Sequence, residues 1–399
     1  MLQLTREQRQ IADSIKDFVF HRGGKKYIAI SGYAGTGKTT VMGCVAAEIV
    51  DSRPDIAIAY CAPTGKAASV LKDKLESFRA LNLKSKVHTI HGHIYRLKSH
   101  VGNKYDWEKR QEKLPYDLIV VDEASMVTEQ MFKDLLSFNI PIIFIGDSWQ
   151  LPPVNSKPFS PLVKTELCLK TVHRQALLNP IVAVATDIRQ GKQVLFGDKG
   201  PLFSRISGRE AVSKCVFDDF VKGIPENDTM ILCGLNRTRI QLNRIARLKL
   251  GFKDHYPCTG EHLMCLRNDR NFGLYNGQIY SVELGMGACL EDDACYRVKL
   301  SNGCVAVAYT GALNCPSDSI GRKMGEDSNA IECCLQNSVQ EDPILFDYGY
   351  VCSVHKSQGS EWDNVLLYDE RTSYMSDDDH AKWLYTGVTR ARNKLCIVG

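Results

Sequence analysis

The segment from Tyr27 to Thr40 limits what this chain can fold into more than any other part of it. It reads YIAISGYAGTGKTT, an apolar run followed by a glycine-rich loop and a Lys-Thr pair, and an apolar helical pattern begins at Val41. This is the G-x-x-x-x-G-K-[ST] phosphate loop, placed between a strand and a helix. Glycines let backbone N–H groups surround phosphate oxygens, and the helix N-terminus adds partial positive charge. The segment therefore predicts a nucleotide-binding α/β domain.

The residue types of this loop indicate separate roles within it. Lys38 can reach the β- and γ-phosphates of a nucleoside triphosphate, and the Thr39 hydroxyl can ligand Mg²⁺. The residues that we expect to bind the nucleotide are Gly32, Ala34, Gly35, Thr36, Gly37, Lys38, Thr39 and Thr40. A glycine-rich strand–helix turn that binds nothing is the alternative, and both flanks of the motif argue against it.

An acidic pair further along the chain fits the same chemistry. Residues 118–126 read LIVVDEASM, so four apolar residues of a buried parallel strand end in Asp122 and Glu123. Carboxylates at this place in an NTPase hold Mg²⁺ and activate water. We expect Asp122 to hold Mg²⁺ through water and Glu123 to be the general base that polarises the attacking water. The alternative, an Asp-Glu helix cap, does not explain the strand before the pair.

Two later positions are candidates for contacts with the γ-phosphate. The apolar run 140–145 leads into GDSWQLPPV, which places Gln150 just past a strand end, and an amide can donate and accept at once. Arg174, in the sequence VHRQ, follows the strand-like LCLK. An arginine brought in from outside the first sheet stabilises the transition state of phosphoryl transfer, by roughly 10³–10⁵ in rate. Taken alone, such an arginine is more often a surface residue, and only the neighbouring motifs support its role.

Length and composition bound the class of protein. The chain has 399 residues, too many for one compact core, and its formal net charge is only +4, so any nucleic-acid surface has to be a local groove. The first twenty residues are interrupted by charges, and no apolar run approaches the roughly eighteen residues of a membrane span. We expect a soluble intracellular protein of the cytoplasm, or of the host cytoplasm if phage-encoded, with no membrane partner.

The cysteines carry less information. There are 15, with no C-x-x-C pair, and eight of them lie between positions 258 and 334. A zinc site in that segment is one interpretation, but the cysteines lack ligand-like spacing. Buried reduced thiols are the favoured interpretation.

Two segments interrupt the alternation of strands and helices. Residues 93–116 combine basic and aromatic side chains around a turn, which indicates a small β-hairpin, although a solvated loop has the same composition. Residues 257–340 alternate apolar and polar positions and hold two Asn-Gly turns, which predicts a small all-β insertion. The closing stretch, WLYTGVTRARNKLCIVG, predicts a helix carrying Arg390 and Arg392 before a final short strand.

Eight motifs taken together resemble one family. They are, in chain order, GYAGTGKTT, APTGKAA, TIHG, VVDEASM, IGDSWQLPPV, VHRQ, SVHKSQGSEW and YTGVTRAR. Their order and spacing resemble the superfamily 1 DNA helicases, and the most similar branch is the RecD/Dda-like group of 5′→3′ helicases. The resemblance covers nearly the whole chain. It implies an α/β protein with two RecA-like P-loop motor domains that uses ATP and Mg²⁺ and binds single-stranded and forked duplex DNA.

The resemblance also implies domain boundaries. They are 1–92 and 117–175 for the first RecA-like domain, which is the ATP-binding core, and 176–256 and 341–399 for the second. The hairpin, residues 93–116, would occupy the position of the strand-splitting pin. Residues 257–340 would be an SH3-like accessory insertion, although the part from about 318 to 342 does not align with the family.

On this resemblance, further residues acquire roles. Gln8 would read the adenine, and Glu361 would lie near the ribose. Gln150 would couple the γ-phosphate to the DNA groove. Arg174 and Arg390 would reach the nucleotide across a cleft from the second motor domain.

The family also implies a track for the single strand. Its residues would be Pro63, Thr64, Thr89, His91, Asn236, His355 and Lys356. They would mostly contact phosphates, so binding should be largely independent of base sequence. Trp107 is the candidate for stacking at the fork. We expect a monomer, with single-strand binding protein or replication and recombination proteins as further partners.

The sequence leaves alternatives open. A single-strand translocase, or the motor subunit of a nuclease or recombination complex, shares every ATPase residue and differs only in whether the hairpin splits strands. An RNA helicase is disfavoured only by similarity to the DNA branch. A phosphate-loop kinase or GTPase has no use for a second α/β domain, and an ATP-dead scaffold would have lost motif residues. The 5′→3′ polarity follows from the family alone.

Overall fold

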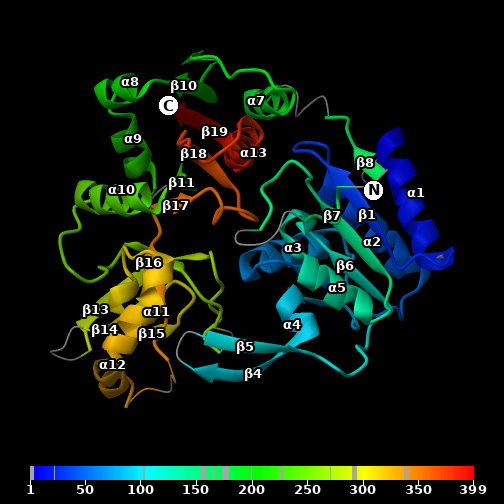
Figure 1. Cartoon of the computed structure of the whole chain (residues 1–399), viewed down its shortest axis with the longest axis horizontal. Helices are drawn as coiled ribbons and strands as arrows, with labels where there is room; N and C mark the ends of the chain where they lie inside the picture. The colour runs from blue at the N-terminus through cyan, green and yellow to red at the C-terminus, as the bar shows by residue number, and fades with distance from the viewer. Residues whose placement is uncertain are drawn as a thin grey trace. The chain divides into compact units, whose positions relative to one another are not determined.

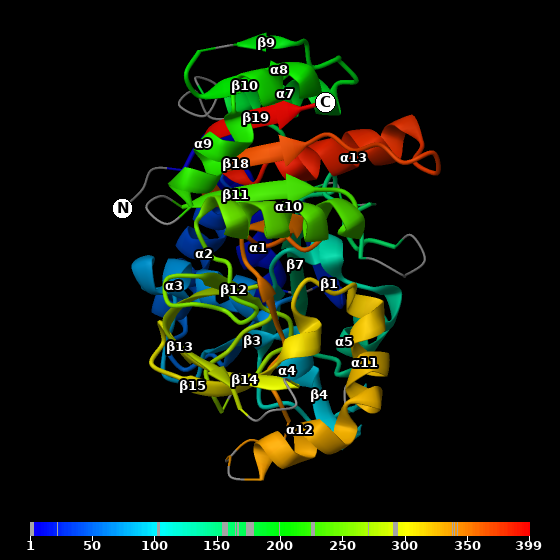
Figure 2. The ribbon, with the colours of Figure 1, turned by 90° about the vertical axis from the view of Figure 1, so that its left-hand side faces the viewer.

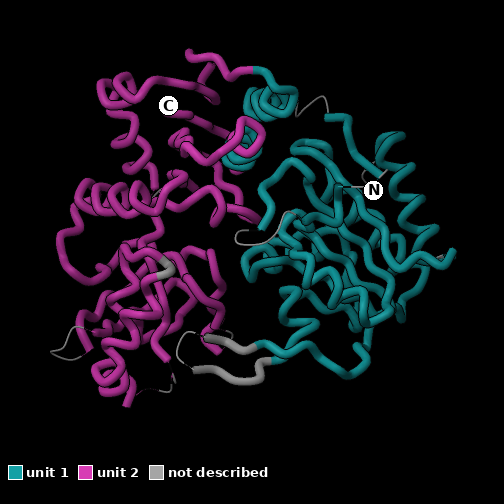
Figure 3. Tube along the Cα trace, viewed as in Figure 1, with its two compact units in different colours: residues 1–99, 106–192, 381–389 teal, residues 100–105, 193–380, 390–399 magenta. Residues whose placement is uncertain are grey.

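The computed structural model describes residues 4–399 except 22, 102–103, 154–158, 164, 166, 173–178, 199, 225–227, 270, 290–293, 337, 339 and 341. The chain forms two compact units, which Figure 3 colours separately. The first comprises residues 1–99, 106–192 and 381–389, and the second comprises residues 100–105, 193–380 and 390–399. Residues 381–389, which the sequence had led us to assign to the second domain, thus pack with the first unit.

The first unit is built on a six-stranded parallel sheet (Figure 1) in the order β3-β2-β6-β7-β1-β8. The strands are β1 Tyr27–Gly32, β2 Ile58–Ala62, β3 Lys86–Thr89, β6 Leu118–Val121, β7 Ile142–Gly146 and β8 Leu167–Leu169. Strands β2, β6 and β7 are buried at every position, as expected of parallel strands covered on both faces. The carboxyl ends of parallel strands share one edge of the sheet, where ligands of such folds bind.

Helices cover both faces of this sheet. They are α1 Arg6–His21, α2 Lys38–Ser52, α3 Gly65–Ser77, α4 Ile90–Ile94 and α5 Glu129–Ser137, with a short turn η1 Ala124–Met126. A further helix of this unit, α7 Pro180–Arg189, follows β8 in the chain. Helices α1, α2 and α3 bury Ile15, Ile49 and Leu71 in one apolar cluster. Helices α4 and α5 bury Ile90 and Leu135 in the other. The phosphate loop therefore stands on a sheet held from both sides.

The second unit also contains a six-stranded sheet, in the order β17-β11-β18-β19-β10-β9, most of which can be followed in Figure 2. The strands are β9 Gly197–Asp198, β10 Phe203–Ile206, β11 Thr229–Cys233, β17 Val351–Ser353, β18 Trp362–Tyr368 and β19 Ala391–Val398. The helices are α8 Gly208–Ser213, α9 Val216–Gly223 and α10 Asn236–Lys249. Helix α13 Asp377–Val388 begins in this unit, and its residues 381–388 belong to the first unit. All strand pairs are parallel except β9 with β10.

The prediction that the closing helix carries Arg390 and Arg392 was wrong. Helix α13 ends at Val388, and Arg392 lies in β19. The carbonyl of Arg390 accepts the N–H of Trp362 at 2.8 Å. The backbone of Arg390 therefore pairs with Trp362 at the start of the β18–β19 ladder. This hydrogen bond takes the place of a helical one, so α13 does not continue through Arg390.

The insertion is an antiparallel sheet in the order β15-β14-β13-β12-β16. Its strands are β12 His262–Cys265, β13 Ile279–Ala288, β14 Cys295–Leu300, β15 Val305–Tyr309 and β16 Phe346–Tyr348. Gly277 and Gly303 have φ of 82° and 80°, the left-handed conformation that Asn-Gly turns need. The hairpin turn at 302–303, which joins β14 to β15, is therefore confirmed. Asn276 and Gly277 form a β-turn directly before β13, in which the N–H of Gln278 donates to the carbonyl of Tyr275 at 3.0 Å, and this turn ends a longer connection from β12.

The insertion is not composed of strands alone. After η2 Thr310–Ala312 come two helices, α11 Ser317–Glu326 and α12 Ser328–Leu335, in the stretch that did not align with the family. Ile320, Met324, Ile331 and Cys334 are buried together with residues of β14 and β15. The alternation of apolar residues ends with β15, and helical spacing replaces it.

The hairpin in the first half of the chain is confirmed as a two-stranded sheet. It consists of β4 Tyr95–Val101 and β5 Lys104–Lys109, and its turn at 102–103 lies outside the described residues. Among the helices that the structure describes, we find none with the length and apolar content to cross a membrane.

Candidate nucleotide site and strand track

The phosphate loop joins β1 to α2 in a conformation that depends on its glycines. Gly35 and Gly37 have φ of 76° and 80°, in the left-handed region. A Cβ at Gly32 would lie 2.7 Å from Cγ of Lys38. Any side chain at position 32 would therefore displace the lysine that the loop presents.

Lys38 is held by carbonyl groups of its own loop. Its Nζ donates to the carbonyls of Gly32 at 2.7 Å and Tyr33 at 3.2 Å, and lies 3.8 Å from a carboxylate oxygen of Asp147. Hydrogen bonds between an ammonium group and phosphate oxygens are stronger than those to neutral carbonyls. The lysine can therefore exchange these partners for a phosphate.

Thr39 and Asp122 fit a magnesium site completed by nucleotide oxygens. Both line a cavity of about 10 Å³ beside Lys38, roughly the space of one water. Burial raises the pKa of Asp122, and the N–H of Glu123 partly offsets this. Among the described residues, no cluster of three His, Cys, Asp or Glu forms a metal site. Mg²⁺ commonly binds to one or two protein oxygens together with substrate phosphates, which suits this pair.

Glu123 follows β6 with an unusual backbone. Its φ and ψ are 50° and 43°, the left-handed region. Non-glycine residues rarely adopt it, and such residues cluster at functional sites. The chain changes direction directly after Asp122. Asp122 and Glu123 are therefore consecutive residues in the turn that follows β6.

Helix α1 contacts this region through two neighbouring residues. Gln8 is buried, and its Nε2 donates to the carbonyl of Thr36 in the phosphate loop at 3.1 Å. Glu7, which we did not single out from the sequence, accepts the N–H groups of Lys170 and Thr171 at 3.0 and 3.1 Å. Burial acts to raise the pKa of Glu7, but these donors outweigh it and the pKa is lowered. Recognition of adenine by Gln8 stays a prediction.

Gln150 lies in the loop after β7. Its side chain is 8% exposed, and its Oε1 has no hydrogen-bond partner among the described residues. The side chain lines a cavity of about 480 Å³ together with Ser125, Tyr27 and Phe132. An amide with an unpartnered oxygen beside a cavity has room to turn, as expected of a residue that changes partner when phosphate arrives.

Two residues of α13 that we did not predict complete this region. The Tyr385 hydroxyl accepts the N–H of Ala34 at 2.9 Å and donates to Oδ2 of Asp147 at 2.7 Å. Oγ1 of Thr386 accepts the N–H of Leu151 at 3.1 Å. The YTGVTRAR motif marks this segment in the sequence, but does not show which partners its buried residues take.

The first part of the predicted strand track forms one edge of the first sheet. Strands β2 and β3 are parallel neighbours, with Ala62 opposite Thr89. Thr64 follows β2 and accepts the N–H of Ala67 at 3.2 Å, and Thr89 accepts the N–H of Gly92 at 3.1 Å. Both threonines therefore cap helices that begin at the same edge, where backbone N–H groups favour anions.

Aromatic residues lie beside this edge. The rings of His91 and Trp107 are 5.9 Å apart, and His91 also lies 5.0 Å from Tyr95. Trp107 is 45% exposed, and burial lowers the pKa of His91. Pro63 is half-buried at the end of β2. An exposed tryptophan next to helix N-termini suits the stacking of an unpaired base.

The second part of the track lies on the second sheet. His355 and Lys356 follow β17, and Asn236 begins α10 after β11, the parallel neighbour of β17. Burial lowers the pKa of His355. Burial and the positive charge of Arg239 lower the pKa of Lys356 to about 8. The two strand ends bring these predicted residues to one edge.

Glu370, which we did not predict, holds the turn that leads into α10. Its Oε2 accepts the N–H groups of Gly234 at 2.7 Å and Leu235 at 3.0 Å, and its Oε1 accepts the hydroxyl of Thr238. The carboxylate therefore fixes the start of the helix at which Asn236 lies.

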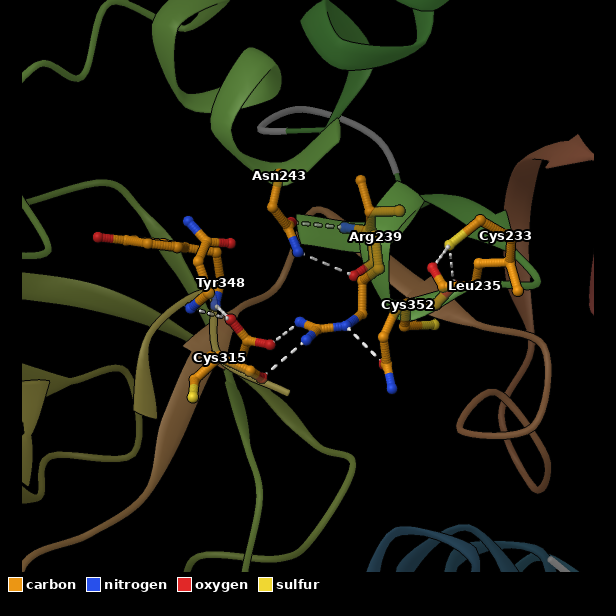
Figure 4. A network of polar contacts seen from close by, with 11 residues as sticks. Cys233, Leu235, Arg239, Asn243, Cys315, Tyr348 and Cys352 are labelled. Atoms are coloured by element: carbon orange, nitrogen blue, oxygen red, sulfur yellow. Dashed lines mark hydrogen bonds and ion pairs between the residues drawn. The ribbon is translucent and has the colours of Figure 1, made fainter. Parts of the chain in front are cut away.

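Helix α10 is also tied to the insertion by a buried network (Figure 4). Arg239 pairs with Asp347 of β16 and donates to the carbonyl of Cys315 at 2.9 Å. Two turns on, Arg247 pairs with Glu261 at 2.7 Å. Both carboxylates belong to the insertion or its sheet. The helix that carries a predicted strand contact is thus joined to the insertion by two arginines.

For the remaining predicted residues, the structure gives little information about a role at the nucleotide. Arg390 is 3% exposed and donates to the carbonyl of Ser360 at 3.0 Å. Glu361 is exposed in the turn before β18. Arg174 lies outside the described residues. The roles of all three stay predictions.

The chain is similar to known proteins in sequence and fold. Residues 3–199 match the AAA domain family, and residues 348–398 match the UvrD-like helicase C-terminal domain family. The RecBCD enzyme subunit RecD of Mycolicibacterium smegmatis is 32% identical, and the match covers 93% of this chain and 68% of that protein. The chain belongs to the RecD-like superfamily 1B helicases. The family resemblance drawn from the sequence is thereby confirmed.

Two further proteins extend the comparison of this RecD-like chain. The ATP-dependent RecD2 DNA helicase of Deinococcus radiodurans is 27% identical over 99% of this chain, which spans only 49% of that relative. A Pif1 helicase from Bacteroides, solved in complex with ADP-AlF3 and ssDNA, has 18% identity and a TM-score of 0.54, covering 100% of this chain and 92% of that one. The shared fold confirms the expected α/β architecture with two RecA-like domains.

Proposed function

We propose that this chain is an ATP-dependent DNA helicase that translocates 5′→3′ on single-stranded DNA and parts duplex DNA. The observation that carries the proposal is the gathering of the phosphate loop, the Asp122–Glu123 pair and Gln150 at one edge of the first sheet. Neighbouring strand ends at that edge carry the threonine-capped helix starts of the strand track. One relative is named an ATP-dependent DNA helicase, which agrees with this.

The site residues divide the chemistry of hydrolysis among them. Loop N–H groups and Lys38 bind the phosphates, and Glu123 accepts a proton from the attacking water. When bound at Thr39 and Asp122, Mg²⁺ neutralises charge on the β- and γ-oxygens. Gln150 changes partner when the γ-phosphate leaves. Arg174 and Arg390 are the proposed sources of further positive charge.

Hydrolysis is converted into movement by changing the grip on the strand. Each unit carries part of the proposed track, so nucleotide-dependent contacts on the two parts can alternate. Parting one base pair costs on the order of 1.4 kcal/mol in stacking. Stacking of a base on an aromatic residue such as Trp107 contributes roughly 1–3 kcal/mol. A wedge that prevents the strands from re-pairing makes unwinding feasible.

A second candidate function is supported by one relative. The RecD of Mycolicibacterium smegmatis is named a subunit of the RecBCD enzyme. This chain would then be the motor of a larger complex, which moves along a single strand without unwinding alone. In either function we propose a cytoplasmic protein that acts as a monomeric motor, with single-strand binding protein or recombination proteins as partners.

Steady-state ATP hydrolysis tests the function shared by both candidates. We expect single-stranded DNA with Mg²⁺ to raise the turnover of ATP at least tenfold over the basal rate, and single-stranded RNA of the same length to raise it much less. Lys38→Ala is the control for contaminating ATPases. Equal stimulation by RNA would favour an RNA helicase, and no stimulation by either would contradict the proposal.

A further inference from the structure

The hydroxyl of Tyr385 lies between two loops of the nucleotide site. It accepts the N–H of Ala34 in the phosphate loop at 2.9 Å and donates to Oδ2 of Asp147, in the loop after β7, at 2.7 Å. The side chain is 1% exposed. Burial and the negative charge of Asp147 raise the pKa of Tyr385 well above its ordinary value. The hydroxyl therefore keeps its proton and remains a donor.

Asp147 is the group on which these contacts converge. It is fully buried, its Oδ1 accepts the N–H of Trp149 at 2.9 Å, and its Oδ2 lies 3.8 Å from Nζ of Lys38. A buried carboxylate needs such partners to offset its lost hydration. When Lys38 binds a phosphate, Asp147 loses part of its interaction with the Lys38 ammonium group. The hydroxyl of Tyr385 and the N–H of Trp149 then stabilise the Asp147 carboxylate.

The next residue holds the other end of the same loop. Oγ1 of Thr386 accepts the N–H of Leu151 at 3.1 Å and donates to the carbonyl of Lys382 at 2.8 Å. Gln150 lies between the two attachment points, and its own N–H donates to the carbonyl of Asp147 at 3.2 Å. The backbone around Gln150 is thus fixed from α13, while its Oε1 has no partner among the described residues.

We propose that Tyr385 is a positioning residue whose hydroxyl links the phosphate loop to Asp147 and so sets the position of Gln150 relative to the γ-phosphate. The inference rests on the proposed function and adds a residue to it. A phosphate at the loop competes with Tyr385 for the N–H of Ala34 and with Asp147 for Lys38. The backbone of Tyr385 is also linked to the residue before Arg390, because the N–H of Thr389 donates to the carbonyl of Tyr385 at 3.0 Å.

Trp149 offers a direct readout of this link. Its ring centroid lies 6.1 Å from that of Tyr385, and its backbone N–H donates to Oδ1 of Asp147. The chain has four tryptophans, so 5-fluorotryptophan labelling gives few ¹⁹F signals, and Trp149→Phe assigns the relevant one. We expect AMP-PNP with Mg²⁺ to shift this signal in the wild-type chain. In Tyr385→Phe, which removes only the hydroxyl, the nucleotide should bind without producing the shift.

Two further variants make the test specific. Thr386→Val loosens the other attachment of the loop and should reduce the same Trp149 shift. Tyr374→Phe is the matched control, because Tyr374 is 96% exposed, and it should leave the shift unchanged. A Tyr385→Phe chain that unfolds at a lower temperature and binds no AMP-PNP would assign the hydroxyl to stability and overturn the inference.

Kinetics separate this inference from the proposed function. We expect Tyr385→Phe to lower the DNA-stimulated kcat about tenfold without raising KM for ATP, because the hydroxyl positions the Gln150 loop and its loss leaves the N–H of Ala34 available to phosphate. An unchanged kcat and an unchanged Trp149 shift would overturn the role of Tyr385 and leave the proposed function intact. If single-stranded DNA does not stimulate the wild-type chain, the proposed function fails, and the Trp149 shift still decides the role of Tyr385.

Discussion

At the scale of single residues, the candidate nucleotide site combines short local segments with partners that lie far apart along the chain. The phosphate loop and the acidic pair are short local patterns, because a phosphate needs several groups from one turn of chain. The partner of Tyr385, Ala34, lies 351 positions away along the chain. Glu370 likewise lies 136 positions from Gly234. Residues of the first kind could be predicted from spacing, whereas residues of the second kind depend on the packing of distant segments.

The two predicted catalytic residues should fail in different ways. Lys38→Ala removes the cation that binds phosphate, so we expect both weak ATP binding and no DNA-stimulated hydrolysis. Glu123→Gln keeps the size and hydrogen-bonding capacity of the side chain but removes the base, so turnover should fall at least 10³-fold while ATP still binds. Fluorescent nucleotide titration and phosphate release measure the two effects. Near-normal turnover in Glu123→Gln would contradict its role as base.

Lys356 should make strand binding depend on pH. Its pKa is lowered to about 8, so the side chain is charged below that pH and neutral above it in the free protein. A phosphate contact favours the charged form, and DNA binding above pH 8 must therefore take up a proton. We expect affinity for single-stranded DNA to fall as pH rises beyond about 8, on the order of tenfold for one charge-assisted hydrogen bond.

Two variants control this pH dependence. Lys356→Arg stays charged throughout and should flatten the profile between pH 7 and 9.5, measured by fluorescence anisotropy at constant ionic strength. Lys214→Met removes a surface lysine that pairs with Glu210 and should keep the wild-type profile. A Lys356→Arg chain with an unaltered pH profile would place the titrating group elsewhere.

At the scale of elements, α10 connects the second sheet to the insertion. Its first residue is a predicted strand contact, its buried Arg239 pairs with Asp347, and its partly buried Arg247 pairs with Glu261. The hairpin turn between β14 and β15 was predictable, because Asn-Gly readily adopts the positive φ that such a turn needs. Helices α11 and α12 were missed because their stretch did not align with the family and its helical spacing was not recognised. The end of α13 was missed because the pairing of Arg390 with Trp362 comes from a neighbouring strand.

The network of Figure 4 predicts a large and specific loss of stability. Arg239→Met leaves the carboxylate of Asp347 buried without its cation, which should cost about 3–5 kcal/mol in the free energy of unfolding. Urea denaturation of the second-unit transition measures it. Lys214→Met, which breaks an exposed pair, should cost no more than about 1 kcal/mol.

A double variant distinguishes charge from packing in this network. Arg239→Met with Asp347→Asn leaves no uncompensated charge and retains an acceptor for the N–H of Asn314, which donates to Asp347 at 2.8 Å. We expect it to recover part of the stability lost in Arg239→Met. A double variant less stable than Arg239→Met would contradict this explanation. It would mean that the Asp347 carboxylate stabilises the fold through contacts other than its pair with Arg239, such as the N–H of Asn314.

At the scale of the whole molecule, the chain contains two sheets, and each carries predicted site residues at its strand ends. The first sheet provides the nucleotide loop, the acidic pair and two threonine-capped helix starts. The second provides Asn236, His355 and Lys356, and the insertion is fastened to the same helix as Asn236. Both sheets were predictable from motifs at strand ends. The assignment of residues 381–389 to the first unit was not, because no local pattern shows with which unit a segment packs.

Strand displacement on two forked duplexes tests the central claim most directly. One fork carries a 5′ single-stranded tail and the other a 3′ tail of the same sequence, and both are mixed with the chain, ATP and Mg²⁺. We predict that only the 5′-tailed fork is opened, and that Lys38→Ala opens neither. Opening of the 3′-tailed fork alone would contradict the polarity. If ATP is consumed on single strands and neither fork opens, the chain is a translocase, and unwinding is contradicted.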